Sequence, residues 1–181
     1  MYYDRGTQSR RIEILLHINS ILVMLDTQEK NIVQCAAALA RQLHRGQVDK
    51  AGVDYFSGHL TTVAKMGKTW QEEVVGYLHD ASEDTSNTVD EVLNLLEERL
   101  EAPLSAAERE ELAVALRLLN HHFAPDREKY IHRIKDNPLA TAVKLHDLTH
   151  NMNLSRLPNP TKKDYERVAR YKKEYDYLSK V

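Results

Sequence analysis

The chain has 181 residues and a formal charge of -2 at pH 7. This length suits one domain with a sizeable core, and the charge gives no reason to expect a nucleic-acid binder. The single cysteine, Cys35, excludes an internal disulfide and favours a reducing compartment, which predicts a cytoplasmic protein. The longest apolar run, at 21–25, is far shorter than the roughly 20 residues that cross a membrane, so no contact with a membrane is expected.

Residues 1–28 are predicted to form an N-terminal extension, in which the stretch 12–25 is strongly apolar. Two arginines precede this stretch, as at the start of a signal peptide. However, Glu13, His17 and Asn19 interrupt it, and no small-residue cleavage site follows. We therefore expect an added N-terminal helix that packs on the domain or on a partner, with a homodimer through this helix as one candidate assembly.

Residues 29–181 are predicted to form one all-α domain. Apolar residues at helical spacing predict a helix over 29–45. Capping-box patterns or prolines mark further helix starts near Trp70, Val89, Ala106, Pro138 and Thr161. Strand alternation of useful length and internal repeats are both absent from the sequence.

Glycines are concentrated in one part of the chain. Five of the six glycines lie at 46–76, so the segment from about Arg45 to Gly58 is predicted to be the least regular part of the domain. Loops on a rigid scaffold are where sites are built, and we expect this loop to form one wall of a site.

The most informative motif is His79-Asp80 followed by Glu83-Asp84, at the end of the helix that starts near Trp70. Histidine and aspartate side by side can bind one divalent metal. Glu83 and Asp84 follow within about one helical turn, where they could handle the protons of an activated water. This layout predicts a hydrolytic metal site.

Two further segments are candidates for completing that site. Asp147 adjoins the apolar face of its helix, where a carboxylate needs a cation or hydrogen bonds, although a helix-surface carboxylate is the alternative. His59 follows the glycine-rich loop, and its alternative reading is a helix-terminal histidine without a ligand role. Together with His79 and Asp80 they would offer two nitrogens and two carboxylates, which suits Mn²⁺, Fe²⁺ or Zn²⁺, and Mg²⁺ is kept as a further alternative.

These motifs, in this order, resemble the HD-domain hydrolases of the RelA/SpoT type, which include the small alarmone hydrolases. The resemblance covers about residues 29–180 and depends on the segments at 47–52, 79–85 and 144–152, with Tyr55 and His59 between them. It implies an all-helical HD-domain bundle with a Mn²⁺ site. It also implies removal of the 3′-pyrophosphate of (p)ppGpp (guanosine tetra- and pentaphosphate) by a metal-activated water, with release of pyrophosphate.

The resemblance also implies a role for each matching residue. The metal ligands would be His59, His79, Asp80 and Asp147. Glu83 and Asp84 would position or deprotonate the attacking water. The residues expected to contact the nucleotide substrate are Lys50, Tyr55, Lys144 and Asn151.

The chain departs from the family pattern in the nucleotide-recognition loop. Asp49 stands where the family has an arginine that helps to hold the guanine nucleotide, and Ala51 replaces the usual serine. An HD-type hydrolase of a different nucleotide, a nucleotidase or a phosphodiesterase, therefore stays open beside the alarmone substrate. A third class is a non-catalytic or antitoxin-like binding protein.

The other histidines are expected to be structural. His44 and His121 lie at helix ends, where a cation is favourable. His150 follows Asp147 by three residues, and we expect a solvated surface histidine, with a role behind the ligands as the alternative.

Overall fold

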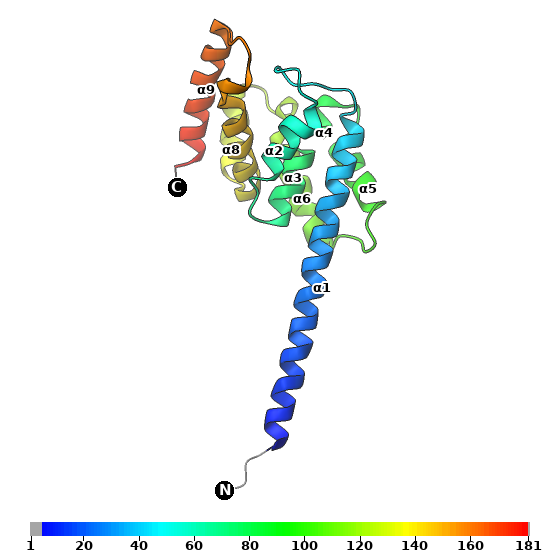
Figure 1. The fold of residues 1–181 in the computed structure, drawn as a ribbon. Coiled ribbons are helices and arrows are strands. Elements are labelled where there is room, and N and C mark those ends of the chain that lie inside the picture. Colours follow the sequence, from blue (N-terminus) through cyan, green and yellow to red (C-terminus); the bar gives the residue numbers. More distant parts are fainter. Residues whose placement is uncertain (1–4, 181) are drawn as a thin grey trace.

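The computed structural model describes the backbone of residues 5–180 and the side chains from Ile14 onward (Figure 1). Over these residues the fold is all-α and contains no strand, only an isolated antiparallel bridge between Val48 and Asp54. The predicted fold class is confirmed at this level. None of the helices in this range combines the length and apolar character that a membrane crossing requires.

The first helix, α1 (Arg5–Leu43), runs without a break through the boundary expected at residue 28. Glycine and proline are both absent from 7–45, so nothing in the chain interrupts the helix before Gly46, which adopts a φ of 81° and ends it. The two helices predicted for this part of the chain are therefore wrong, because one continuous helix spans both.

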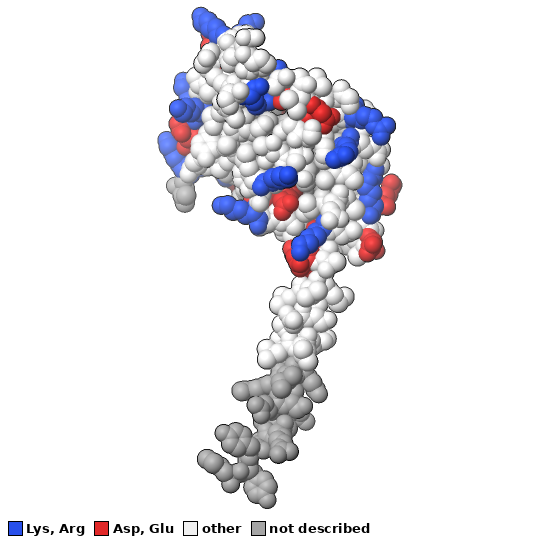
Figure 2. Space-filling view, in the orientation of Figure 1, with Lys and Arg blue, Asp and Glu red and all other residues white. Residues whose placement is uncertain are grey.

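The two halves of α1 have different surroundings. From Ile32 onward, one face of α1 is buried against the domain, as at Ala36 and Leu39. Before that point the helix projects from the body, and Figure 2 shows it white, without Lys, Arg, Asp or Glu, between the edge of the body and the grey part. All nine large apolar side chains at 14–25 are exposed.

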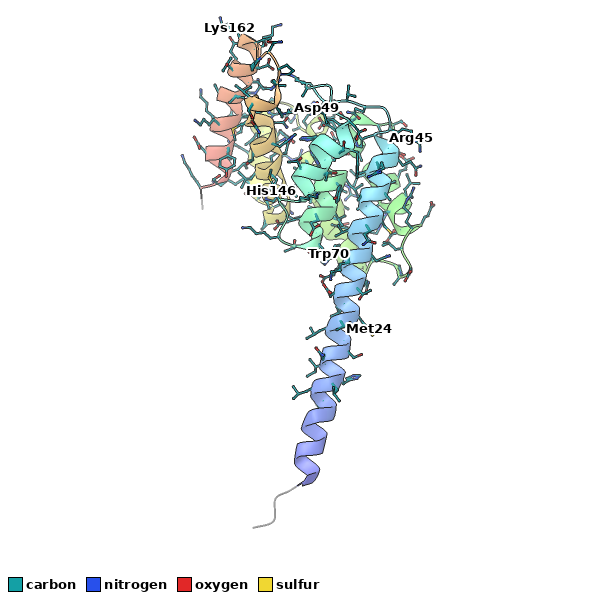
Figure 3. The ribbon with its side chains drawn as sticks, viewed as in Figure 1. Met24, Arg45, Asp49, Trp70, His146 and Lys162 are labelled. Atoms are coloured by element: carbon teal, nitrogen blue, oxygen red, sulfur yellow. The ribbon has the colours of Figure 1, made fainter. Side chains whose placement is uncertain are left out.

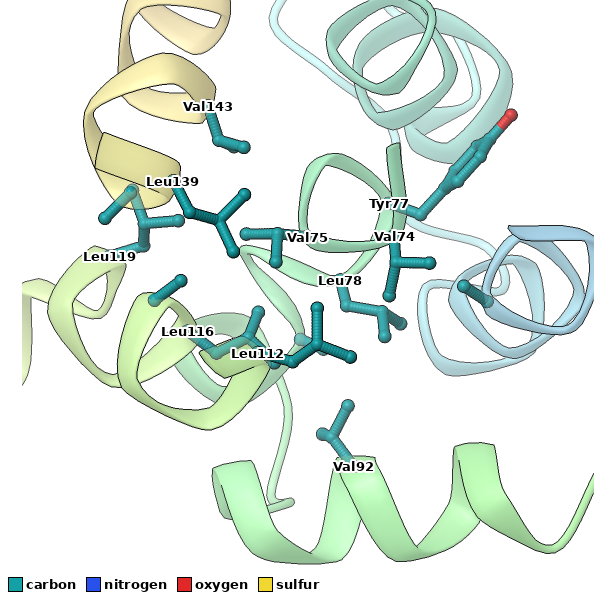
Figure 4. Packing of buried hydrophobic residues seen from close by; sticks show 14 of the residues in the cluster. Val74, Val75, Tyr77, Leu78, Val92, Leu112, Leu116, Leu119, Leu139 and Val143 are labelled. Carbon is teal, nitrogen blue, oxygen red and sulfur yellow. The ribbon is translucent and has the colours of Figure 1, made fainter. Parts of the chain in front are cut away.

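The body is built around α3 (Trp70–Leu78), which packs against α1, α2 (Thr61–Ala64), α6 (Ala106–Leu119) and α8 (Pro138–Met152). Figure 4 shows Val75 of α3 beside Leu139 and Val143 of α8, and Leu78 of α3 beside Leu112 of α6. A Cβ on Gly76 would lie only 2.7 Å from Ala64 Cα, so the glycine lets α3 approach α2 closely. This contact brings the segment with His59 close to the end of α3, where His79 lies.

The remaining elements complete the bundle. They are the π-helical turn η1 (Phe56–Leu60), α4 (Ala81–Asp84), α5 (Val89–Glu97), the 3-10 turns η2 (His121–Phe123) and η3 (Leu154–Arg156), α7 (Arg127–Lys135) and α9 (Lys162–Leu178). The five predicted helix starts are confirmed, whereas α7 was not predicted although Asp126 caps it by accepting from Lys129 N–H. At Thr69 the capping box is shifted, because Glu72 accepts from Lys68 N–H.

Candidate metal centre

The four predicted metal ligands meet at one point inside the bundle. His59 comes from η1, His79 and Asp80 from the junction of α3 and α4, and Asp147 from α8. His59 Nε2 lies 3.3 Å from His79 Nε2, 3.4 Å from Asp147 Oδ1 and 3.5 Å from Asp80 Oδ2. His79 Nε2 is also 3.0 Å from Asp80 Oδ2. Three segments far apart in the sequence therefore direct two nitrogens and two carboxylate oxygens at each other.

Burial and charge act strongly on this cluster. One donor atom each from His59, His79 and Asp147 lies within 4.8 Å of the others, and all three residues are buried. Burial on its own lowers the pKa of His79, but the charge of Asp80, its hydrogen bond and Asp147 raise that pKa to about 9. Burial on its own raises the pKa of Asp147, but Lys144 and the two histidines hold it below its ordinary value. The cluster is therefore a place where positive charge is stabilised.

His79 is oriented by the helix that carries it. Its Nδ1 lies 2.9 Å from the carbonyl oxygen of Gly76, to which the Nδ1–H donates. In the neutral ring this leaves the lone pair on Nε2, the nitrogen that faces the other three donors. A carbonyl acceptor behind the ring is the usual way in which proteins fix a metal-binding histidine.

His150 lies behind His59, and the expectation of a solvated surface histidine is wrong. Its Nδ1 is 2.7 Å from His59 Nδ1, and the ring centroids are 4.9 Å apart. Burial, followed by the positive charges of His59 and Arg156, lowers the pKa of His150 to about 4. A spacing of three residues on α8 places Asp147 and His150 on one side of the helix, which is the signal behind the alternative kept for His150, a role behind the ligands.

Three residues expected at the substrate instead contact the ligand carboxylates. The Tyr55 hydroxyl donates to Asp80 Oδ2 at 2.6 Å, and burial and the charge of Asp80 raise the pKa of Tyr55. Lys144 Nζ donates to Asp147 Oδ2 at 2.7 Å. Asn151 Nδ2 donates to Asp147 Oδ1. These donors fix the two carboxylates in place, and all three residues also line the adjoining cavity.

Glu83 faces the same cavity as the four ligand residues and is held by a residue that the sequence analysis took to be structural. His121 lies at the start of η2, and its Nδ1 and backbone N–H lie 2.7 Å and 3.1 Å from Glu83 Oε2. The neighbouring Asn120 is buried and donates to both oxygens of Ser82 at 3.0 Å, which ties the end of α6 to α4. No local pattern marks His121, because the contact depends on where two helix ends meet.

Asp84 points to a second cavity. Its Oδ2 accepts from Gln47 Nε2 at 2.8 Å, and Gln47 Oε1 lies 2.7 Å from Nδ1 of the buried His44. The Glu83-Asp84 pair, expected to act on one water, is therefore divided between two chambers.

The two chambers adjoin each other. The cavity lined by the four predicted ligand residues, the metal chamber, has a volume of ≈ 160 Å³. The second chamber has a volume of ≈ 240 Å³. Tyr55, His59, Asn151 and Tyr171 line both of them. The second chamber is also lined by Lys50, the lysine expected at the substrate, so the predicted loop does form one of its walls.

No protein-family model matches the chain. Interpretation of the site therefore rests on its own geometry and chemistry.

Proposed function

We propose that this protein is a metal-dependent phosphohydrolase of the HD-domain type. The observation that carries the proposal is the convergence of His59, His79, Asp80 and Asp147 on one buried point beside a positioned glutamate. A purely structural cluster has no need for two histidine Nε2 atoms 3.3 Å apart facing two carboxylates.

The donor set fits a divalent transition metal. Two imidazole nitrogens and two carboxylates are the mixed ligands that Mn²⁺, Fe²⁺ and Zn²⁺ accept, with Mn²⁺ the first choice from the resemblance to RelA/SpoT-type hydrolases. The ion would supply a Lewis acid that offsets phosphate charge and makes water a better nucleophile.

Glu83 is the residue that would take the proton of the attacking water. Both donors of His121 reach Oε2, so Oε1 is the oxygen turned to this task. His121 acts as a positioning residue, because it fixes the carboxylate without reaching the reacting atoms. Tyr55, Lys144 and Asn151 hold Asp80 and Asp147 against movement during turnover.

The first candidate substrate is (p)ppGpp, whose 3′-pyrophosphate would be released as pyrophosphate. The position of Lys50 in the wall of the second chamber supports a substrate rich in phosphate. Asp49 favours keeping a different nucleotide as the second candidate, since it is paired with Arg156 and cannot act as the family's arginine does.

The test is product analysis with Mn²⁺-loaded protein against ppGpp, pppGpp, the adenine analogue and simple nucleotides. We expect phosphate or pyrophosphate release from at least one of them, and Glu83→Gln should reduce turnover at least about 100-fold with metal content unchanged. Glu111→Gln, at an exposed position on α6, is the matched control. Bound metal without turnover of any nucleotide would overturn the proposal and favour a binding protein.

A further inference from the structure

The second chamber contains a cationic residue that the sequence motifs did not identify. Arg156 in η3 lines this chamber together with Lys50 and Arg167, and its side chain is only 16% exposed. Arg167 is paired with Asp164 at 3.0 Å on the same helix. Arg156 differs from it because its partners lie on other segments, and one of them leads to the candidate metal ligands.

Two contacts hold the guanidinium of Arg156 in a fixed position. One terminal nitrogen, Nη1, donates to Asp49 Oδ2, and the other, Nη2, donates to Asn151 Oδ1 at 3.2 Å. Asn151 in turn donates to Asp147, so Arg156 is linked to the metal centre through one side chain. A guanidinium fixed at two nitrogens has lost its freedom before any ligand arrives.

Asp49 has the geometry of a residue that positions Arg156. Its Oδ1 accepts from Ala51 N–H at 2.8 Å and Val53 N–H at 3.0 Å, which closes the turn at Gly52. Its Oδ2 is the oxygen bound to Arg156, and its side chain is 7% exposed. Asp49 stands where the family pattern has an arginine. Through its ion pair it holds Arg156 of η3 against the loop that carries Asp49. Figure 3 shows Asp49 at the end of the body where α9 begins, at Lys162.

The terminal nitrogens of Arg156 keep hydrogens for a ligand. Nη1 and Nη2 each carry two hydrogens and donate one of them to a described residue. The Nε atom is buried and lies out of reach of a ligand in the chamber. The chamber that Arg156 lines adjoins the metal chamber and is ≈ 240 Å³ in volume, enough for a phosphate-sized group.

We propose that Arg156 binds a phosphate oxygen of the substrate in the second chamber, away from the bond that is broken, and that Asp49 positions it. The second N–H of Nη1 or Nη2 is the donor that a phosphate oxygen would accept from, and charge-assisted bonds of this kind are strong. The identity of the substrate rests on the proposed function, but the anion site itself can be measured without turnover.

The first test is calorimetric titration of inorganic pyrophosphate into the full-length chain, both treated with EDTA and loaded with Mn²⁺. Arg156→Lys keeps a charge beside Asp49 but has one terminal nitrogen in place of two, so the fold should persist while pyrophosphate affinity falls at least about tenfold in both forms. Arg170→Lys, in which the arginine is exposed and lies on α9 outside both chambers, should bind as the wild type does. Affinity within twofold of wild type for Arg156→Lys would overturn the inference.

A kinetic test separates this inference from the proposed function. If a nucleotide is hydrolysed, Arg156→Lys should raise KM and leave kcat within about twofold, because the contact is made equally in the ground and transition states. Asp49→Asn should raise KM in the same way with its metal content unchanged. An unchanged KM in both variants would refute the role of Arg156 while leaving the hydrolase intact. If no nucleotide is hydrolysed but Arg156→Lys loses pyrophosphate affinity, the anion site is supported and the proposed hydrolase function is not.

Discussion

The Nδ1 atoms of His59 and His150 lie 2.7 Å apart, so the two rings share one hydrogen bond that only one of them can donate. His150 has a pKa of about 4 because of burial and the nearby positive charges, and it is neutral at pH 7. For His59 to present a lone pair on Nε2, its own proton must lie on Nδ1. His59 is therefore the donor, and His150 is the acceptor that fixes its tautomer.

Replacing His150 should weaken metal binding without removing a ligand. We expect His150→Ala to raise the Kd for Mn²⁺ by about 10- to 100-fold, the usual effect of losing the hydrogen-bond partner of a ligating histidine. Titration against a competing chelator measures this. The matched control is His146→Ala on the same helix. His146 Nδ1 makes no hydrogen bond with a described residue, and its pKa is lowered by burial, with smaller effects from Glu72 and Lys68 outside the site. Equal affinities for wild type and His150→Ala would refute the role of His150.

Sequence reasoning predicted the parts of this site whose chemistry is local. His79-Asp80 and Glu83-Asp84 adjoin in sequence, so residue type and spacing marked them as a candidate site, although not that Asp84 would line the second chamber. Asp147 and His59 were open on spacing alone, because the structure brings them together across 88 residues, 3.4 Å apart. Only the resemblance to a known family favoured them as ligands.

The residues that sequence reasoning missed, or held in this role only as an alternative, share one property. His121, His150 and Arg156 each act through a partner 38 or more residues away, so their roles depend on how helix ends pack. Their local sequences differ little from those of exposed helix ends. Asp49 carried an indirect signal, since an acidic residue in a loop expected to bind phosphate requires a nearby cation.

The raised pKa of His79 predicts proton release when metal binds. Metal binds neutral imidazole, so below pH 9 an ion must displace the proton that Asp80 and Asp147 stabilise. Apparent Mn²⁺ affinity should rise by about tenfold per pH unit from pH 7 and level off near pH 9. Calorimetry in buffers of different protonation enthalpy should count about one proton released at pH 7. A pH-independent affinity would contradict this prediction.

The same shift fixes the sign of the effect on stability. A raised pKa in the folded state means that protonated His79 stabilises the metal-free fold below its ordinary pKa of 6.5, and that this contribution is lost as pH rises to about 9. The Tm of the EDTA-treated protein should therefore fall across that interval. Excess Mn²⁺ should reduce the fall, because the bound ion replaces the proton as the positive charge.

Lys144 and Asp147 form an ion pair whose side chains are only 10% and 9% exposed. Lys144→Met leaves the Asp147 carboxylate buried without its main counter-charge, so the free energy of unfolding of the EDTA-treated protein should fall by about 3 kcal/mol. Saturating Mn²⁺ should restore part of the lost free energy of unfolding, since the ion also neutralises Asp147. Urea unfolding with and without Mn²⁺ measures both effects. Lys163→Met, at an exposed position in α9, should change neither the free energy of unfolding nor its response to Mn²⁺. A loss of stability in Lys144→Met as small as in this control would show that the ion pair contributes little.

The projecting half of α1 exposes nine large apolar side chains and no charged residue over 14–25. An isolated helix has little stability without packing, and an apolar surface of this kind normally faces a partner. Leu15, Ile18, Leu22 and Leu25 repeat at the spacing of a two-helix seam. An identical helix is self-complementary to such a seam, and the projection keeps two domain bodies apart (Figure 1). A second copy of this chain is therefore the expected partner.

Light scattering after size exclusion tests this assembly on the full-length chain. We expect wild type to form a dimer at micromolar concentration and Ile18→Glu/Leu22→Glu to be monomeric, because two charges in the seam of each copy would be buried without partners. Ser20→Glu places the same charge on the opposite side of the helix and should stay dimeric. The metal centre lies in the body of the domain, so Mn²⁺ affinity should be equal in all three proteins. A monomeric wild type, or a dimer that survives both substitutions, would contradict pairing through this seam.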